Sequence, residues 1–322
     1  MSEITLLVLA DPAEPTMQLL KALGPDVRIK IANTADGFSP EIEDARVLFS
    51  WGGSKPEVLK VLATAPKLEW IHTRSAGLDG LLAPELIQSP VLLTNGSGSF
   101  SQSLGEFVMT GALYFAKDLP RMLRSKATHH WDVFDVAEIS KQTMGIVGHG
   151  DIGRAISWRT KAMGMRVLAL RRDISPRAGD ENVDRLYSNE QLHEMLPECD
   201  YVTVSAPLTA YTRHLLSTPE FNVMKSTAVV MNVGRGPVIH EAALVEALRS
   251  GRIRGAALDV FEVEPLPADS PLWDMENVLI SAHTADHTKD WLADGANFFL
   301  EQFGRWAKGE ALKNIVDKQA GY

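Results

Sequence analysis

The sequence predicts an α/β fold of two doubly wound parallel sheets, with one domain inserted into the other. Short apolar runs alternate with helical patterns over the first hundred residues, and the alternation resumes after residue 143. Strands that alternate with helices favour a parallel sheet, because each parallel connection needs a crossover. The chain has 322 residues, 45% of them hydrophobic, which is enough for two domains that each bury a core.

The first domain is expected to begin with the chain. Strand-like runs lie at 4–10, 27–32, 45–51, 68–74 and 91–95, and helical patterns lie at 16–23 and 56–63. Residues 96–99, two glycines and two serines, mark a hinge-like break. A long helix is then expected over 104–123, followed by a polar and irregular segment over 125–141.

The second domain is expected around residues 144–173, a stretch with the pattern of a strand, a glycine turn, a helix and a strand. This is the layout of a dinucleotide-binding βαβ unit. Gly148 is expected to allow a tight turn, Gly150 to let the backbone approach a pyrophosphate, and Gly153 to let helix and strand pack closely. A glycine-rich turn without a ligand is the alternative interpretation.

The position of this turn predicts the domain organisation. About 140 residues with a sheet of their own precede it, and strand-like runs follow it at 200–205, 228–233, 256–260 and 278–281. We therefore predict a Rossmann dinucleotide-binding domain, residues 101–287, inserted into a flavodoxin-like substrate domain formed by residues 1–100 and 288–322. The last helix, near 289–308, is expected to return to the first domain, with the active site in the cleft between the two.

Composition excludes several classes of protein. A net charge of −9 argues against binding to nucleic acid or to an anionic membrane, since both need a basic surface. No apolar run reaches the roughly 18 residues of a membrane span, and the N-terminus lacks the basic region of a signal peptide. The single cysteine, Cys199, allows no intrachain disulfide and is expected to be buried. A cytoplasmic protein without a metal site is expected.

Three polar residues follow predicted strands of the second domain, where ligand sites gather in open α/β sheets. Arg235 stands between two glycines, and its planar guanidinium can bind a carboxylate through two parallel hydrogen bonds. Glu264 can orient a histidine, and His283 can exchange a proton near neutral pH. Taken singly, they could also be a surface arginine, a solvated capping acid and a structural histidine.

Together these residues predict the reduction of a 2-oxo acid. A nicotinamide cofactor would deliver hydride to the carbonyl carbon, and His283 would give the carbonyl oxygen a proton. Glu264 would keep His283 charged and aimed, while Arg235 would bind the neighbouring carboxylate.

The chain resembles the D-isomer-specific 2-hydroxyacid dehydrogenases along almost its whole length. The motifs that carry the resemblance lie at 75–79, 105–106, 148–153, 206–212, 232–238, 257–265 and 282–283. The resemblance implies that Arg235 binds substrate, that Glu264 pairs with histidine and that His283 is the acid/base. The family usually has proline before this histidine, whereas this chain has Ala282, a change that removes no reactive group.

The resemblance also implies binding roles for other residues. The backbone of Ala76 and Gly77 would help to hold the substrate carboxylate. From its place in the loop after the third strand, Trp51 would wall the pocket, stack on an aromatic substrate or belong to the core. Residues expected at the cofactor are Gly148, Gly150, Asp151, Ile152, Gly153, Pro207, Thr212, Val233, Asp259 and Ala285, with Asp259 near the nicotinamide carboxamide and the pyrophosphate near Asp151 and Ile152. A homodimer is implied, formed through the cofactor domain, with segment 129–132 reaching the partner.

The end of the second cofactor-domain strand predicts the type of cofactor. Members of the family that use NAD carry an acid there, whereas this chain has Arg171 and Arg172. A guanidinium pair would bind a 2′-phosphate, and Arg177 could add a third charge, although Asp173 could still accept the ribose. NADP(H) is therefore the preferred cofactor, with NAD(H) possible, and members with such arginines are often glyoxylate or hydroxypyruvate reductases.

Two other functions remain open from the sequence. One is a cofactor-sensing binding protein without turnover, like the corepressors that share this fold and retain the same three polar residues. The other is a related dehydrogenase that acts on formate or phosphite. The loops at 51–54 and 75–78 should contact the substrate side chain, but they do not identify the 2-hydroxy acid.

Overall fold

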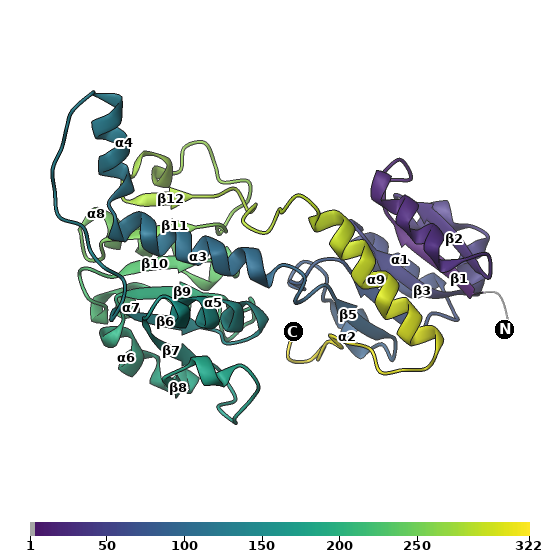
Figure 1. Ribbon diagram of the computed structural model, residues 1–322. Helices are drawn as coiled ribbons and strands as arrows, with labels where there is room; N and C mark the ends of the chain where they lie inside the picture. The colour runs from purple at the N-terminus through teal and green to yellow at the C-terminus, as the bar shows by residue number, and fades with distance from the viewer. Residues whose placement is uncertain (1–3) are drawn as a thin grey trace. The chain divides into compact units, whose positions relative to one another are not determined.

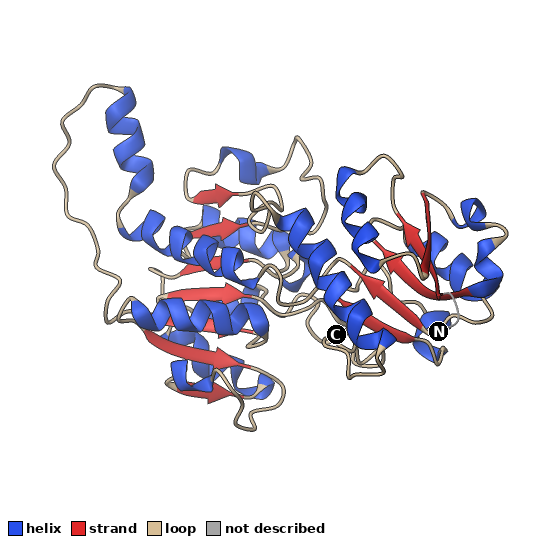
Figure 2. Ribbon diagram, turned by 45° about the vertical axis from the view of Figure 1, so that its right-hand side comes forward, coloured by secondary structure: helices blue, strands red, loops and turns tan. Residues whose placement is uncertain are grey.

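The computed structural model describes residues 4–322, which form two compact units, each built on its own parallel sheet (Figure 1). The first unit comprises Met1–Ser99 and Lys289–Tyr322, and the second comprises Phe100–Thr288. In both units helices cover the strands (Figure 2). No helix among residues 4–322 combines the length and the apolar character that a membrane span requires.

The first sheet has the strand order β2-β1-β3-β4-β5, and all its strands are parallel. This is the doubly wound order of flavodoxin-like folds. The strands are β1 (Ile4–Leu9), β2 (Val27–Ala32), β3 (Ala45–Ser50), β4 (Trp70–Thr73) and β5 (Leu92–Asn95). The helices of this unit are η1 (Pro15–Leu23), η2 (Ala35–Phe38), η3 (Glu41–Asp44), α1 (Lys55–Thr64), α2 (Pro84–Gln88) and α9 (Trp291–Ala307).

Both faces of the first sheet are buried, and alternate side chains along each strand pack into different cores. Leu7 and Leu9 belong to the core shared with α1 and α2, whereas Leu6 and Val8 belong to the core shared with η1 and α9. Successive side chains of a strand point to opposite faces, so one run of apolar residues serves both cores. The last helix packs here because Phe299 stacks on Phe49, with ring centroids 4.0 Å apart.

The second sheet has the order β12-β11-β10-β9-β6-β7-β8 and is also parallel throughout. Counted from β6, the strand before the glycine turn, this is the Rossmann order 3-2-1-4-5-6 with one further strand. The strands are β6 (Thr143–Val147), β7 (Arg166–Leu170), β8 (Arg185–Tyr187), β9 (Tyr201–Val204), β10 (Val229–Asn232), β11 (Gly255–Leu258) and β12 (Val278–Ile280).

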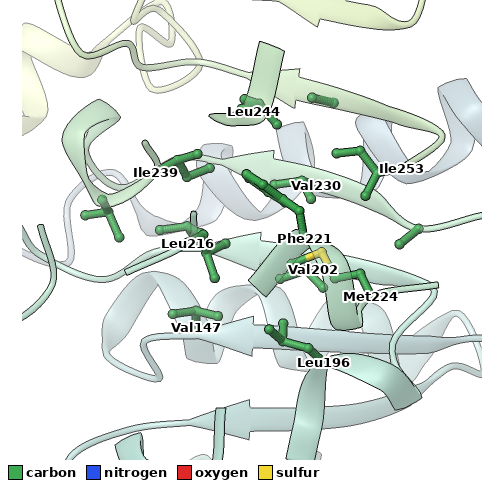
Figure 3. Close-up of a cluster of buried hydrophobic side chains, with 14 of the residues drawn as sticks. Val147, Leu196, Val202, Leu216, Phe221, Met224, Val230, Ile239, Leu244 and Ile253 are labelled. Atoms are coloured by element: carbon green, nitrogen blue, oxygen red, sulfur yellow. The ribbon is translucent and has the colours of Figure 1, made fainter. Parts of the chain in front are cut away.

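Helices lie on both faces of the second sheet. They are α3 (Ser101–Ala116), α4 (Leu119–Ala127), α5 (Asp151–Ala162), η4 (Asp180–Asn182), η5 (Asn189–Gln191), α6 (Leu192–Met195), η6 (Leu196–Glu198), α7 (Thr218–Val223), η7 (Gly236–Val238), α8 (Glu241–Arg249) and η8 (Pro271–Asp274). Figure 3 shows the core between the sheet and α6, α7 and α8, where Phe221 packs among Val202, Leu216 and Val230. A second core joins α3 and α5 to the opposite face. The two-domain parallel α/β fold expected from the sequence is confirmed.

The single long helix expected over 104–123 is wrong. Helix α3 ends at Ala116 and α4 begins at Leu119, with Asp118 between them at a positive φ of 51°. The Asp118 side chain caps α4 by accepting from the backbone N–H of Arg121. The signal was Pro120, which cannot donate the backbone hydrogen bond that a continuous helix needs at that position.

Candidate active site

Six strand ends of the second sheet lie in register at one edge. Leu170, Val147, Val204, Asn232, Leu258 and Ile280 follow one another across neighbouring strands. In a parallel sheet these carboxyl ends share one edge, so the loops that follow them leave from the same side. Every catalytic or cofactor residue that the sequence predicts in this unit lies in one of those six loops or in the helix α5 that one of them enters.

The three glycines of the turn after β6 have different surroundings. A Cβ atom on Gly148, whose φ is 96°, would lie 2.7 Å from backbone atoms of Ala206, and one on Gly153 would lie 2.4 Å from the carbonyl oxygen of Gly148. Apart from its own chain neighbours, a Cβ on Gly150 would have no atom of residues 4–322 within 4 Å. The first and third positions therefore require glycine for packing, whereas the space beside Gly150 is left open.

Helix α5 begins at Asp151, directly after this open space. The N–H groups of Asp151, Ile152 and Gly153 belong to the first helical turn, and such groups have no partner within a helix. The Asp151 carboxylate forms an ion pair with Arg154 one turn later. Open space beside Gly150 and a helix start that can bind an anion together fit a pyrophosphate.

The loop after β10 holds Arg235 by close backbone packing. A Cβ on Gly236 would lie 1.8 Å from the carbonyl oxygen of Phe261, and one on Gly234 would lie 2.7 Å from that of Ala206. The buried Asn232 side chain accepts from the N–H of Gly234 and donates to the carbonyl of Arg235, at 3.1 and 3.0 Å. The glycines therefore let the Arg235 loop approach two neighbouring loops, a reason that the sequence alone did not reveal.

Glu264 and His283 meet at this edge. The Nδ1 atom of His283 lies 2.7 Å from Oε2 of Glu264, and the Phe261 N–H donates to the other carboxylate oxygen at 2.9 Å. Both side chains are partly exposed, His283 by 43% and Glu264 by 35%. Since Glu264 engages Nδ1, the Nε2 atom of His283 remains available for proton exchange with a ligand.

Asp259 builds the turn that presents His283. Its carbonyl accepts from the N–H of His283 at 2.9 Å, and its buried carboxylate accepts from the N–H groups of Thr284 and Ala285 at 3.0 Å each. His283 has a positive φ of 55°, a conformation that costs a non-glycine residue about 1–2 kcal/mol. The backbone bonds from Asp259 offset this cost, and Ala282 in place of proline is compatible with the turn.

A further carboxyl group, Asp286, lies close to this turn and was not expected from the sequence. Burial raises its pKa, whereas the nearby His287 and His283 lower it. The Nε2 atom of His287 lies 3.7 Å from the Asp286 carboxylate. The surroundings of His283 therefore contain three acids: Glu264, Asp259 and Asp286.

The loop after β9 carries two more of the expected cofactor residues, Pro207 and Thr212, while Val233 and Ala285 follow β10 and β12. Thr212 closes this loop by donating to the carbonyl of Pro207 at 2.6 Å and accepting from the N–H of Thr209 at 2.8 Å. Val233 is buried at the end of the neighbouring strand β10, and the carbonyl of Ala285 accepts from the hydroxyl of Ser103. These residues are thus placed by local hydrogen bonds and strand packing.

Arg171 has surroundings that differ from the expectation. Its side chain is only 6% exposed, and its two terminal nitrogens donate to the Asp180 carboxylate at 2.6 and 2.7 Å. Hydrogen bonds from Arg171 hold the pKa of Asp180 below its usual value. His149, which burial keeps neutral with a pKa of about 4, lies 3.5 Å from the same carboxylate. Arg171 also donates to the carbonyls of Asp173 and Ser175, so it ties the 171–180 segment together, and these contacts occupy its guanidinium.

Arg172 and Arg177 lie on the surface of that segment. Arg177 forms an ion pair with Asp173, which also accepts from the N–H and the hydroxyl of Ser175 at 2.9 and 2.6 Å. The hydrogen bonds from Ser175 hold the pKa of Asp173 well below its usual range. Asp173 is thus engaged within its own loop, which argues against its serving as a ribose acceptor.

The expected substrate residues of the first unit lie after β3 and β4. Ala76 and Gly77 are half-buried in a bend that follows β4. Trp51 is 7% exposed and packs in the core that contains Phe49, with the Arg74 guanidinium 4.7 Å from its ring centroid. This burial favours the core interpretation of Trp51. Cys199 is buried as expected, and burial raises the pKa of its thiol to about 12.

Known proteins are similar to this chain in sequence and in fold. Residues 109–285 match the family described as D-isomer specific 2-hydroxyacid dehydrogenase, NAD binding domain. The glyoxylate/hydroxypyruvate reductase B of Enterobacter sp. is 33% identical over 94% of this chain and 91% of its own length. A D-isomer specific 2-hydroxyacid dehydrogenase of Xanthobacter autotrophicus, solved with NADPH and MES, superposes with a TM-score of 0.86 at 31% identity over all of both chains.

A longer relative is similar as well. The D-3-phosphoglycerate dehydrogenase of Methanocaldococcus jannaschii is 30% identical over 97% of this chain, which spans 59% of the length of that relative. The two parallel sheets agree with the structural similarity. The chain belongs to the D-isomer specific 2-hydroxyacid dehydrogenase family.

Proposed function

We propose that this chain is an NADP(H)-dependent D-2-hydroxyacid dehydrogenase that works mainly as a 2-oxo acid reductase, with glyoxylate or hydroxypyruvate as substrate. The observation that carries the proposal is the Glu264–His283 hydrogen bond at the sheet edge that also holds the Arg235 loop and the glycine turn. The names of two relatives, a glyoxylate/hydroxypyruvate reductase and a dehydrogenase solved with NADPH, support it.

The residues around the glycine turn fit the cofactor. The amides of Asp151, Ile152 and Gly153 would bind the pyrophosphate beside Gly150, while Gly148 shapes the turn. Arg172, with Arg177 beside it, would bind the 2′-phosphate, and Arg171 would hold their loop in place through Asp180. Pro207, Thr212, Val233, Asp259 and Ala285 would line the path to the nicotinamide.

The reacting end of the site would transfer a proton and hold a carboxylate. When bound, the cofactor supplies a hydride for the carbonyl carbon of the 2-oxo acid. His283 would give the Nε2 proton to the carbonyl oxygen, which becomes the hydroxyl, and Glu264 would stabilise the imidazolium before the transfer. Arg235 would bind the substrate carboxylate through a bidentate pair, and the amides of Ala76 and Gly77 would add two donors.

We assign the roles of the two units on the same grounds. Residues 101–287 would bind the dinucleotide, and residues 1–100 with 288–322 would bind the rest of the substrate. A cytoplasmic location belongs to the same proposal, since a single cysteine, which allows no intrachain disulfide, suits a reducing compartment.

The test is a matrix of NADPH and NADH against glyoxylate, hydroxypyruvate, pyruvate and phenylpyruvate, followed by the absorbance of the reduced cofactor. We expect oxidation of NADPH with glyoxylate or hydroxypyruvate, and slower oxidation of NADH. Tight NADPH binding without turnover of any 2-oxo acid would instead indicate a cofactor-sensing protein. Oxidation of formate or phosphite without 2-oxo acid reduction would indicate the other dehydrogenase class.

We also propose a homodimer formed through the second unit. Trp131 is 92% exposed on the segment after α4, which extends from the second sheet (Figure 1). Met109, Leu113, Trp158 and Met163 line a pocket of about 360 Å³ on the surface of α3 and α5. Apolar side chains gathered in this way mark an interaction surface. Sedimentation equilibrium should give twice the chain mass, and Trp131→Ala should shift the equilibrium towards monomer.

A further inference from the structure

The bend that follows β4 and contains Ala76 and Gly77 is held by hydrogen bonds on the side that faces β5. The carbonyl of Ser75 accepts from the N–H of Gly96 at 3.2 Å, and the carbonyl of Ala76 accepts from Nδ2 of Asn95 at 2.7 Å. Both partners lie at the end of β5, the strand beside β4. Two consecutive carbonyl groups of the bend therefore face the same neighbour, which does not occur in an extended strand, where carbonyls alternate.

The direction of these carbonyls decides the direction of the amides. In a trans peptide the C=O and the N–H of one unit point to opposite sides, and both peptide units here are trans. The N–H groups of Ala76 and Gly77 are therefore both turned away from β5. Within residues 4–322 no acceptor is found for either group, and both residues are half-buried. Successive amides turned to one side form a site that binds an anion.

The Asn95 carboxamide is fixed in the orientation that this arrangement needs. Its side chain is buried, and its Oδ1 accepts from the N–H of Ser97 at 3.2 Å, so that Nδ2 faces Ala76. A second asparagine donates at the same strand end without contacting the bend, since Nδ2 of Asn314 donates to the carbonyls of Asn95 and Ser97 at 3.2 and 2.6 Å. Only a side chain that donates and accepts at once can serve both partners of Asn95.

We infer that Asn95 is a positioning residue for substrate binding, which aims the amides of Ala76 and Gly77 at the substrate carboxylate. It acts through the carbonyl of Ala76 and does not itself touch the substrate. This inference rests on the proposed function, in which those two amides bind the carboxylate of a 2-oxo acid.

The test compares Asn95→Asp with Asn314→Asp. The first variant keeps the shape of the side chain but places an oxygen against the Ala76 carbonyl. The two oxygens repel each other, so the N–H groups of Ala76 and Gly77 should lose their common direction. The second adds the same charge at the same strand end and also removes a side-chain donor to backbone carbonyls, but it keeps the hydrogen bond between Asn95 and the Ala76 carbonyl. We expect the KM for glyoxylate to rise by about tenfold or more in Asn95→Asp and to stay near the wild-type value in Asn314→Asp.

The relative changes in KM and kcat distinguish a positioning role of Asn95 from a general loss of structure. A carboxylate anchor acts on substrate and transition state alike, so KM should rise more than kcat falls. The Kd for NADPH, measured by fluorescence, should stay unchanged in both variants. Equal KM values in Asn95→Asp and wild type, or equal increases in both variants, would overturn the inference.

A binding measurement makes the inference independent of turnover. Oxamate, a 2-oxo acid analogue that is not reduced, can be titrated calorimetrically into the protein saturated with NADPH. We expect wild type and Asn314→Asp to bind it and Asn95→Asp to bind about tenfold more weakly. If oxamate binds in this pattern but no 2-oxo acid is reduced, the proposed function fails and the inference stands. If 2-oxo acids are reduced but Asn95→Asp binds oxamate as tightly as wild type, the inference fails and the proposed function stands.

Discussion

The two units prepare their ligand groups in opposite ways. In the proposed site the first unit would offer main-chain amides, those of Ala76 and Gly77, whose direction we assign to the Asn95 side chain that donates to the Ala76 carbonyl. At the reacting end of the second unit the proposed groups are side chains, Arg235 and His283, and their loops are held by close main-chain packing and hydrogen bonds. The side chains of Arg235 and His283 indicate their chemistry in the sequence, whereas Ala76 and Gly77 have no polar side chain that would indicate a binding role.

The largest effect should follow from removing the proton donor. In His283→Gln the side chain keeps a polar end but cannot transfer a proton, so kcat for glyoxylate should fall by about 10³-fold. Steady-state kinetics with NADPH measures this loss, and cofactor fluorescence should show unchanged NADPH binding. A kcat within a few fold of wild type would show that His283 is not the proton donor, and the second unit would then lack its proposed acid/base.

A pair of glycine variants tests the claim that the main chain positions the second site. Gly236→Ala would bring a Cβ within 1.8 Å of the Phe261 carbonyl oxygen, so the loops must separate. We expect a loss of about 3 kcal/mol in the free energy of unfolding, measured by urea denaturation, together with weaker substrate binding.

Gly150→Ala is the matched control, because its Cβ would meet no protein atom within 4 Å. Its stability without cofactor should stay close to that of wild type, while its affinity for NADPH falls because the Cβ occupies space meant for the pyrophosphate. A large loss of stability in Gly150→Ala would contradict the division between packing glycines and the ligand glycine.

Arg235→Lys should show that geometry matters as well as charge. Lysine keeps the positive charge but cannot form two parallel hydrogen bonds with a carboxylate. We expect kcat/KM for the 2-oxo acid to fall by roughly 30-fold, within the range of a lost charge-assisted hydrogen bond. An unchanged kcat/KM would mean that the arginine acts only as a point charge or lies away from the substrate.

The smallest effect should separate two neighbouring arginines. Arg172→Ala should weaken NADPH binding by about tenfold and leave NADH binding nearly unchanged, because it removes a hydrogen bond to a charged phosphate. Arg171→Ala should instead leave Asp180 without its buried partner, lower the free energy of unfolding and affect both cofactors similarly. Titrations of each variant with NADPH and NADH distinguish the two, and a selective loss of NADPH binding in Arg171→Ala would reverse the assignment.

Much of the fold was predictable from local patterns. The alternation of apolar runs with helical patterns predicted the parallel sheets, and most strand positions agree with the structure to within a few residues. The short edge strand β8 (Arg185–Tyr187) was missed, because three residues give too little pattern. The break at Asp118 was missed although Pro120 was present, because the apolar spacing continues across it.

The sequence by itself determined the order of strands and helices, the position of the glycine turn, and the presence of Arg235, Glu264 and His283 after strands of one sheet. These follow from residue type and spacing, which one position or a short window contains. Only the tertiary structure decided that Asp180 engages Arg171, that Trp51 lies in the core, and that the Asn95 side chain donates to the Ala76 carbonyl. The physical reason is that burial and the direction of a backbone N–H depend on partners distant in the sequence, which residue type alone does not specify.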